Sequence, residues 1–174
     1  MDQNGFWSVV EFAVMDKRHD AIETAKLLSG ALSFDDLSRV VLKIIRDEVG
    51  IDRGTVFVVD RERGEIRSSV AEKMRIGAIA LPIGSGIAGT VAETGQIIDT
   101  EDAYEDDRFD AKFDPLLNYE TRDIYCMPIK NESGKIVGVL ELLNRTRPLS
   151  GKDKEFLQEL TLQLASALER VVGR

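Results

Sequence analysis

The chain has 174 residues, of which 43% are hydrophobic and 31% charged, with a formal net charge of −8, values typical of one globular domain. Its single cysteine, Cys126, and single histidine, His19, exclude an internal disulfide and leave too few ligands for the common metal sites, so we predict no metal site and no catalytic residue. Because the balance is acidic and no apolar run is long enough to span a bilayer, we expect a cytoplasmic protein without nucleic-acid or membrane contacts.

Helical periodicity dominates the beginning of the chain. Apolar residues at spacings of three and four over residues 1–31 predict an N-terminal signalling and dimerisation helix outside the compact domain, which we expect over residues 32–174. The first helix of that domain is predicted to start after Ser33, an N-cap followed three residues later by the acid Asp36, and to stop at Gly50.

Strand-forming residues come next. Residues 55–59 are β-branched or aromatic and predict a buried strand, and residues 65–71 predict its half-exposed hairpin partner. A further strand is expected over residues 78–81, because Pro82 can lie only at the end or edge of a strand.

A glycine-rich segment, residues 84–95, is predicted to form a tight turn and a short helix that ends at Gly95. It lacks the lysine of a phosphate loop and the dinucleotide-binding fingerprint. Two interpretations stay open: close packing of a small helix on a sheet, or an anion bound by backbone N–H groups at the helix N-terminus. In the second case Ser85, Gly86 and Ile87 are binding residues.

An acidic and then aromatic segment follows a short predicted strand at residues 96–99. Seven of the twelve residues from 99 to 110 are acidic, without the spacing of an EF-hand, so a solvated loop is favoured over a cation site. Its continuation carries Phe109 and Tyr119 and contains a proline. We therefore interpret residues 99–120 as an irregular lid over a pocket, with these two aromatic side chains as walls or stacking partners.

Two strands, residues 121–129 and 136–143, are predicted after the lid, with Thr121 at the junction. Alternation places Glu141 on one face with Val137, Val139 and Leu143. A carboxylate among apolar residues needs a partner, which is either a nearby Arg or Lys or a ligand. The last helix is expected to begin after Ser150, and its apolar face reaches the end of the chain, which indicates pairing between copies.

These elements, together with several short motifs, resemble the GAF domain family from about Leu27 to Val172. The matching residues are Ile51 to Phe57, Gly86 to Gly89, Val91, Thr94-Gly95, Asp106 to Phe109, Cys126 to Ile129 and Gly138 to Asn144. The resemblance implies an α+β, PAS-like fold: a central antiparallel sheet of about six strands, with N- and C-terminal helices on one face and a ligand pocket under a lid on the other.

Within that family, the segment from Arg108 to Ile129 is similar to the cyclic-nucleotide-binding branch found in phosphodiesterases and adenylyl cyclases. The resemblance implies that this segment, with Arg108, Phe109, Tyr119 and Thr121, shapes the pocket. We expect Glu141 as a further polar group of the pocket, and Arg108 or Arg122 as the basic residue that could line it. Asn118 replaces the glycine that this branch carries. A supporting motif of the branch implies an ion pair between Arg145 and Asp153.

The resemblance thus implies a non-catalytic sensor in signal transduction that binds a small molecule, with cAMP or cGMP as the leading candidate and no other cofactor. A homodimer through the terminal helices would relay binding to an output domain or protein. The alternative is an interaction module with a closed or vestigial pocket, and the apolar faces of both terminal helices favour it.

Overall fold

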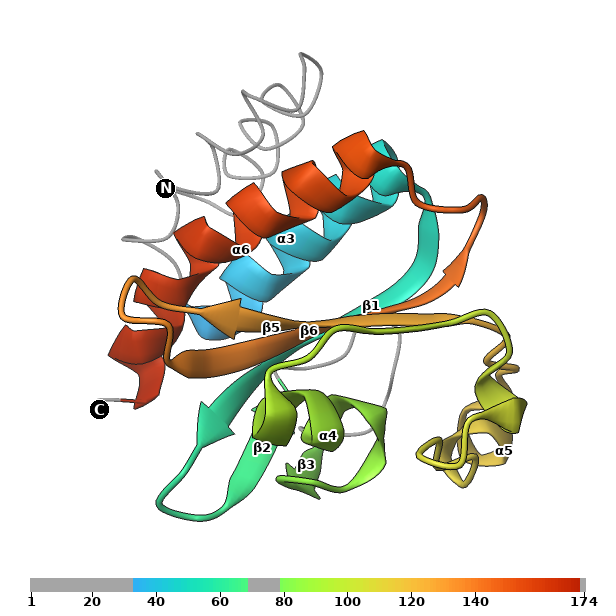
Figure 1. Ribbon diagram of the computed structural model, residues 1–174, viewed down its shortest axis with the longest axis horizontal. Coiled ribbons are helices and arrows are strands. Elements are labelled where there is room, and N and C mark those ends of the chain that lie inside the picture. The colour runs from blue at the N-terminus through green and yellow to red at the C-terminus, as the bar shows by residue number, and fades with distance from the viewer. Residues whose placement is uncertain (1–32, 69–78, 173–174) are drawn as a thin grey trace.

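The computed structural model describes residues 33–68 and 79–172. The predicted helix over residues 1–31 lies outside them, as do the end of the predicted strand 65–71 and residue 78. The elements follow the expected order (Figure 1): α3 (Phe34–Val49), β1 (Ile51–Asp60), β2 (Glu65–Ser68), β3 (Ala80–Pro82), α4 (Gly86–Thr94), β4 (Ile98–Thr100), the 3-10 turn η1 (Ala103–Glu105), α5 (Phe113–Leu117), β5 (Ile124–Lys130), β6 (Ile136–Arg145) and α6 (Gly151–Val172).

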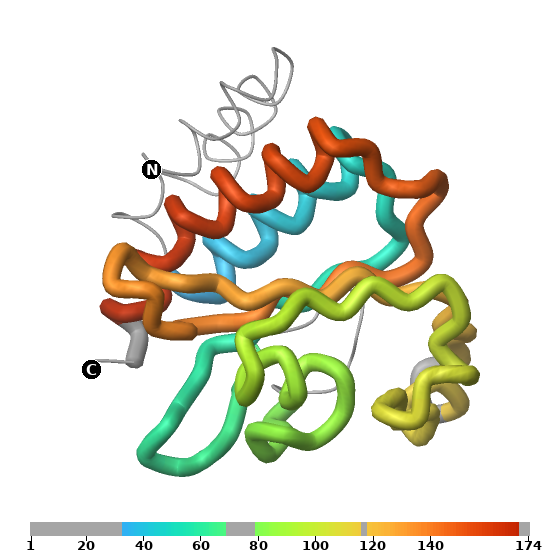
Figure 2. Tube along the Cα trace, in the orientation of Figure 1, coloured from blue at the N-terminus to red at the C-terminus, as the bar shows by residue number. Residues whose placement is uncertain are grey.

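One antiparallel sheet of six strands, in the order β3-β2-β1-β6-β5-β4, organises the fold. Helices α3 and α6 lie side by side on one face, and α4 with the lid segment lies on the other (Figure 1). Figure 2 traces the chain between β4 and β5 as an excursion away from the sheet, which includes η1 and α5. The predicted α+β class and the sheet of about six strands are confirmed.

Both long helices begin, and α3 also ends, as their capping residues predict. The Ser33 hydroxyl oxygen accepts a hydrogen bond from the Asp36 N–H at 3.2 Å, and Gly50 ends α3 in the left-handed conformation with φ 80°. At the start of α6, Ser150 and Asp153 form a reciprocal capping box: each backbone N–H donates to the other's side chain, at 2.8 and 3.2 Å.

Two buried clusters lie on the two faces of the sheet. The helix-side core packs under α3 and α6 and includes Leu140 and Leu142, whereas the cavity-side core includes Phe57 and Val139. The alternation along β6 therefore separates the faces as predicted, with one exception. Val137 was expected on the face of Val139 and Glu141, but it belongs to the helix-side core, because the register between β5 and β6 shifts at Ile129/Lys130.

Gly138 explains how closely α6 approaches the sheet. A Cβ atom at this position would lie 2.6 Å from the Phe57 carbonyl oxygen and 2.4 Å from a methyl carbon of Leu168. Only glycine leaves enough room for this contact between strand and helix.

The lid is more ordered than the sequence predicts. Residues 113–117 form the short helix α5, where no regular element was expected, and β5 begins at Ile124 rather than at residue 121. Asn118 ends α5 with φ 45°, and its N–H donates to the carbonyl oxygens of Asp114 and Pro115. Asparagine is one of the few residues besides glycine that adopt this conformation readily, so it suits the position that the resemblance assigns to glycine.

Candidate ligand-binding site

A cavity lies between the sheet and the lid, on the face opposite α3 and α6. Its volume is about 110 Å³, smaller than the roughly 300–1,000 Å³ typical of small-molecule sites. Strands β1 and β6 supply its floor, α4 and the residues around β3 supply one wall, and the lid supplies the other. The lining residues are Arg53, Thr55, Phe57, Ile79, Leu81, Ser85, Gly86, Ile87, Ala88, Phe109, Asp110, Phe113, Asp114, Tyr119, Thr121, Ile124, Glu141 and Leu143.

Seven of the eight residues predicted for the site line this one cavity, although they come from four separate stretches of the chain. They are Ser85, Gly86, Ile87, Phe109, Tyr119, Thr121 and Glu141. Their role in ligand binding stays a prediction. Arg108 does not line the cavity. Its guanidinium binds the carboxylate of Asp106 at 2.6 and 2.8 Å, and 45% of its side chain is exposed.

Among the described residues that line the cavity, Arg53 is the one basic residue, and it was not among the predicted site residues. Arg122 does not line the cavity either. The guanidinium carbon of Arg53 lies 3.8 Å from the centre of the Tyr119 ring, in a cation–π contact. Strand alternation was the available signal: Arg53 precedes Thr55 and Phe57 at intervals of two in β1, so all three share the cavity face.

Asp114 fixes the lid from inside and was also missed. Its carboxylate is 5% exposed and accepts three hydrogen bonds: from the Thr121 N–H at 2.7 Å, the Thr121 hydroxyl at 2.8 Å and the Tyr104 hydroxyl at 2.9 Å. The bond to Asp114 raises the pKa of Tyr104. Thr121, predicted as a polar group of the pocket, therefore links α5 to the segment that leads into β5. No pattern in the sequence singles out Asp114 among the many acids of this region.

Glu141 of β6 belongs to the cavity floor. In the ladder its neighbours are Thr55 on β1 and Cys126 on β5. Burial raises the pKa of its carboxyl to about 7, and burial, followed by the charge of Glu141, raises the pKa of the Cys126 thiol. Within residues 33–68 and 79–172, no hydrogen bond or ion pair reaches the Glu141 carboxylate. The sequence left two alternatives for this acid, a nearby Arg or Lys or a ligand. The described part of the chain shows no Arg or Lys bonded to it.

The first turn of α4 supplies the backbone of one cavity wall. Ser85 is its N-cap residue, with an extended backbone, and its side chain makes no capping hydrogen bond. Residues 85–88 all line the cavity. The first N–H groups of a helix have no partners within the helix, so this wall offers donors and the positive end of the helix dipole.

Known proteins resemble this chain in sequence and in fold. The model of the GAF domain family matches residues 33–168, most of the chain. The chain belongs to the GAF domain family. Solved structures agree in fold: the GAF domain of a phosphoenolpyruvate-protein phosphotransferase from Coxiella burnetii superposes with a TM-score of 0.75 at 18% identity, covering 90% of this chain and 95% of that one.

Curated relatives of this GAF domain include cyclic-nucleotide phosphodiesterases. It is 31% identical over 154 residues, 80% of the chain, to the dual 3',5'-cyclic-AMP and -GMP phosphodiesterase 11A of Takifugu rubripes. It is 31% identical over 151 residues, 78% of the chain, to the corresponding phosphodiesterase 11 of Drosophila melanogaster. The matched region spans only 17% and 10% of these two proteins. None of the described helices is long and apolar enough to cross a membrane.

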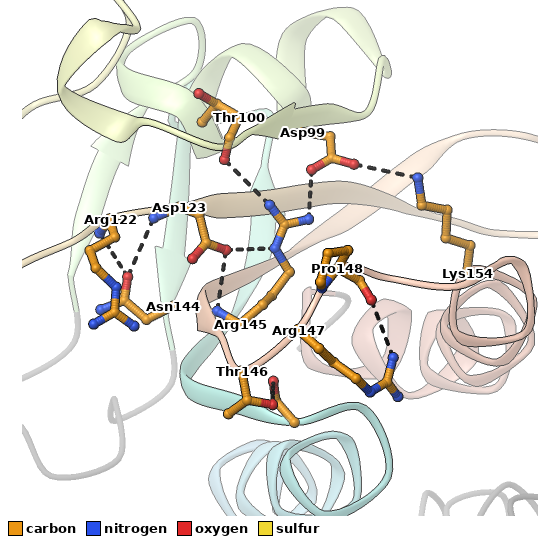
Figure 3. Close-up of polar contacts among 11 residues, drawn as sticks. Asp99, Thr100, Arg122, Asp123, Asn144, Arg145, Thr146, Arg147, Pro148 and Lys154 are labelled. Carbon is orange, nitrogen blue, oxygen red and sulfur yellow. Dashed lines mark hydrogen bonds and ion pairs between the residues drawn. The ribbon is translucent and has the colours of Figure 1, made fainter.

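A polar network at the end of β6 connects the GAF domain's lid to its sheet and its last helix (Figure 3). Arg145, with 8% of its side chain exposed, bonds Asp123 at 2.5 Å and Asp99 at 2.6 Å, and Asp99 also pairs with Lys154 of α6 at 3.4 Å. The predicted pair of Arg145 with Asp153 is wrong. Arg147 binds Asp153 instead, at 2.6 Å, because Arg145 still belongs to β6 and reaches across the sheet edge, whereas Arg147 lies in the loop leading to α6.

Asn144 completes this network. Its side-chain oxygen accepts hydrogen bonds from the N–H groups of Arg122 at 2.7 Å and Asp123 at 3.4 Å, and its side-chain nitrogen donates to the Glu120 carbonyl at 2.7 Å. This one amide therefore contributes three of the hydrogen bonds that hold the segment leading from the lid into β5, and Figure 3 shows those to Arg122 and Asp123.

Proposed function

We propose that this GAF domain is a regulatory, non-catalytic module whose cavity binds a cyclic nucleotide, cAMP or cGMP. The observation that carries the proposal is the composition of the cavity. Aromatic and aliphatic side chains surround one guanidinium, that of Arg53, and one carboxylate without a partner among the described residues, that of Glu141. A nucleotide has an aromatic base, an anionic phosphate and several hydrogen-bond donors, which complement these three features. The named activity of the phosphodiesterase relatives agrees with this ligand class.

The acidic lid does not oppose an anionic ligand as strongly as its composition suggests. Asp106 binds Arg108, Asp110 binds Lys112, and Asp99 binds Arg145 and Lys154. Asp114 is stabilised by three donors. Among these carboxylates, those of Asp99, Asp106 and Asp110 thus have a cationic partner, and the first turn of α4 offers N–H donors for a phosphate.

Binding is tested by adding cAMP or cGMP to the purified chain and following thermal unfolding and titration heat. We expect at least one nucleotide to raise the melting temperature, because a ligand present at about 100 times its Kd stabilises the folded state by about 2.7 kcal/mol. Absence of both a temperature shift and binding heat at millimolar nucleotide would contradict the proposal.

Thr121→Ala tests whether the link between α5 and the segment leading into β5 supports that binding. Removing the hydroxyl breaks one of the three hydrogen bonds to Asp114, and we expect nucleotide affinity to fall about tenfold, because a lost hydrogen bond to a charged group is equivalent to about 1.5 kcal/mol. Thr161→Ala is the matched control. Thr161 is similarly buried, and its hydroxyl donates within α6, across the sheet from the cavity. Equal affinity losses in both variants would contradict a role of the lid in nucleotide binding.

Relay through the terminal helices is the second part of the proposal. Helix α6 packs on the back of β1, β5 and β6, and β1 and β6 carry the cavity floor on their other face. A ligand that moves the lid would act on α6 through the network of Arg145, Asp99 and Lys154. A homodimer through these helices would transmit the change to an output domain or partner protein.

A further inference from the structure

We propose that Glu141 reads the base of the bound nucleotide, and that ionisation of Glu141 makes the site selective for guanine over adenine. This inference rests on the proposed function, since it assumes that a cyclic nucleotide occupies the cavity. The inference identifies Glu141 as the residue that determines which nucleotide is preferred, and it makes that preference depend on pH.

Position singles out Glu141 for this role. It is the one acid on the sheet floor among the described lining residues, and the two lid acids, Asp110 and Asp114, already have donors. Thr55 and Cys126, its neighbours in the ladder, are uncharged. Phe57, Phe109 and Phe113 line the same space and provide apolar surfaces for a flat ring. A base held against these rings would present an edge to the carboxyl group.

The two purines present different edges. Guanine places two donors, N1–H and the 2-amino group, side by side, and an ionised carboxylate accepts both. Adenine places an amino donor beside the N1 acceptor, so a second hydrogen bond requires a proton on the carboxyl. An ionised Glu141 would set its negative charge against the adenine N1 lone pair. The protonated acid can serve either base, because guanine also offers an adjacent donor and acceptor at N1–H and O6.

Glu141 titrates near neutral pH, because burial raises the pKa of its carboxyl to about 7. The charged or titratable groups that face it are Arg53 of β1, Cys126 of β5, and Asp110, Asp114 and Tyr119 of the lid. Burial raises the pKa values of Cys126 and Tyr119, so both stay neutral here. Residues 85–88 of α4 carry no titratable side chain.

The direction of the pH effect follows from these pairings. Between about pH 6 and pH 8 the protonated fraction of a group with a pKa of about 7 falls from about nine tenths to one tenth, so cAMP affinity should fall about tenfold. Guanine gains a charge-assisted pair over the same range, so cGMP affinity should not fall through this group. Any effect of pH on the phosphate is common to both nucleotides and cancels in their ratio.

The experiment measures Kd for cAMP and cGMP by titration calorimetry on the full chain at several pH values from about 6 to 8. We expect the preference for cGMP over cAMP to increase about tenfold or more across this range. Repeating the titrations at pH 8 in buffers of different ionisation enthalpy should reveal net proton uptake with cAMP and none with cGMP. Parallel pH profiles for the two nucleotides would overturn this inference and leave the proposed function intact, whereas no binding of either nucleotide would remove both.

Glu141→Gln is the decisive variant, because the amide keeps the shape of the side chain but offers one donor and one acceptor at every pH. We expect its cGMP-to-cAMP preference to be independent of pH and close to that of the wild type at pH 6. Glu155→Gln, the same chemical change at an exposed site on α6, should keep the wild-type profile. A pH-dependent preference that survives in Glu141→Gln would assign the effect to another group and overturn the inference.

Discussion

Two asparagines have a positive φ, and their side chains contribute differently to the structure. Asn118, with φ 45°, is exposed and provides the left-handed end of α5. Asn144, with φ 53°, is 4% exposed, and its amide makes the three hydrogen bonds that hold residues 120–123. The first position needs only a permissive backbone, whereas the second needs the amide itself.

Glycine substitution separates these roles. We expect Asn118→Gly to change the free energy of unfolding by no more than about 0.5 kcal/mol, since glycine adopts positive φ freely. Asn144→Gly keeps the backbone conformation but leaves three partly buried backbone groups without the amide that they bond, and we expect a loss of about 2 kcal/mol. Urea unfolding of the two variants measures both values. Similar losses at the two positions would show that backbone conformation, and not the amide, matters at Asn144.

Glu141 should also leave a signature in the stability of the empty protein. Its folded-state pKa of about 7 lies above its ordinary value of 4.5, so between these values the folded state binds more protons than the unfolded state. The contribution of this group to stability is thus complete below about pH 4.5 and is lost as pH rises through 7. We expect Glu141→Gln to exceed the wild type in stability by about 2 kcal/mol more at pH 8 than at pH 5, a value that allows for some hydration of the carboxylate. A difference that does not vary with pH would contradict the raised pKa.

At the scale of elements, residues at the end of β6 connect the lid, the sheet edge and α6. Arg145 is nearly buried and is the common partner of Asp99 on β4 and Asp123 before β5, and its NH2 group donates to the Thr100 carbonyl at 3.4 Å. Removing one member of such a group leaves the opposite charges without compensation in a poorly solvated place.

Arg145→Ala should therefore destabilise the fold by about 3 kcal/mol and loosen β4. Arg63→Ala is the control. Arg63 is 62% exposed and lies 3.7 Å from Asp60, and we expect a change within about 0.5 kcal/mol. Chemical denaturation gives the two energies, and hydrogen exchange of residues 98–100 reports the edge strand. If hydrogen exchange of residues 98–100 is unaltered in Arg145→Ala, Arg145 does not hold β4 in place.

Elements with a strong local signal were predictable from the sequence. The caps at Ser33 and Ser150 define where α3 and α6 begin, since capping depends on residues that are neighbours in the chain. Val137 was assigned to the wrong face because a bulge depends on the pairing of two strands. Asp114 and Arg147 were missed for a related reason: their partners are chosen by the path of the lid and of the loop after β6, which no local pattern encodes.

At the scale of the whole molecule, the sheet separates the side of the cavity from the side of the long helices. The cavity lies on one face of the sheet. The lid lies on the same face, and α3 and α6 cover the other (Figure 1). Leu162 of α6 is 58% exposed, on the helix side. This position agrees with the proposed homodimer, in which helices of two copies meet behind the sheet.

Light scattering after size exclusion tests that dimer. We expect the full chain to elute as a dimer at micromolar concentration, and Leu162→Lys to shift it toward the monomer, because a buried charge opposes association. Ile97→Lys places the same charge at another exposed apolar residue, 45% exposed and next to β4, and should leave the dimer intact. A monomeric wild-type chain would contradict dimerisation.

The central pair of strands has a consequence for how the chain reaches its fold. Strand β1 begins at residue 51, and its partner β6 ends at residue 145, so the middle of the sheet joins the two most distant strands. A nascent chain must expose the apolar residues of β1 until β6 has been synthesised, and closing so long a loop slows the search for the native pairing. During that interval β1 is the segment most open to aggregation or chaperone binding, so translation speed between the two strands should influence the yield of folded protein.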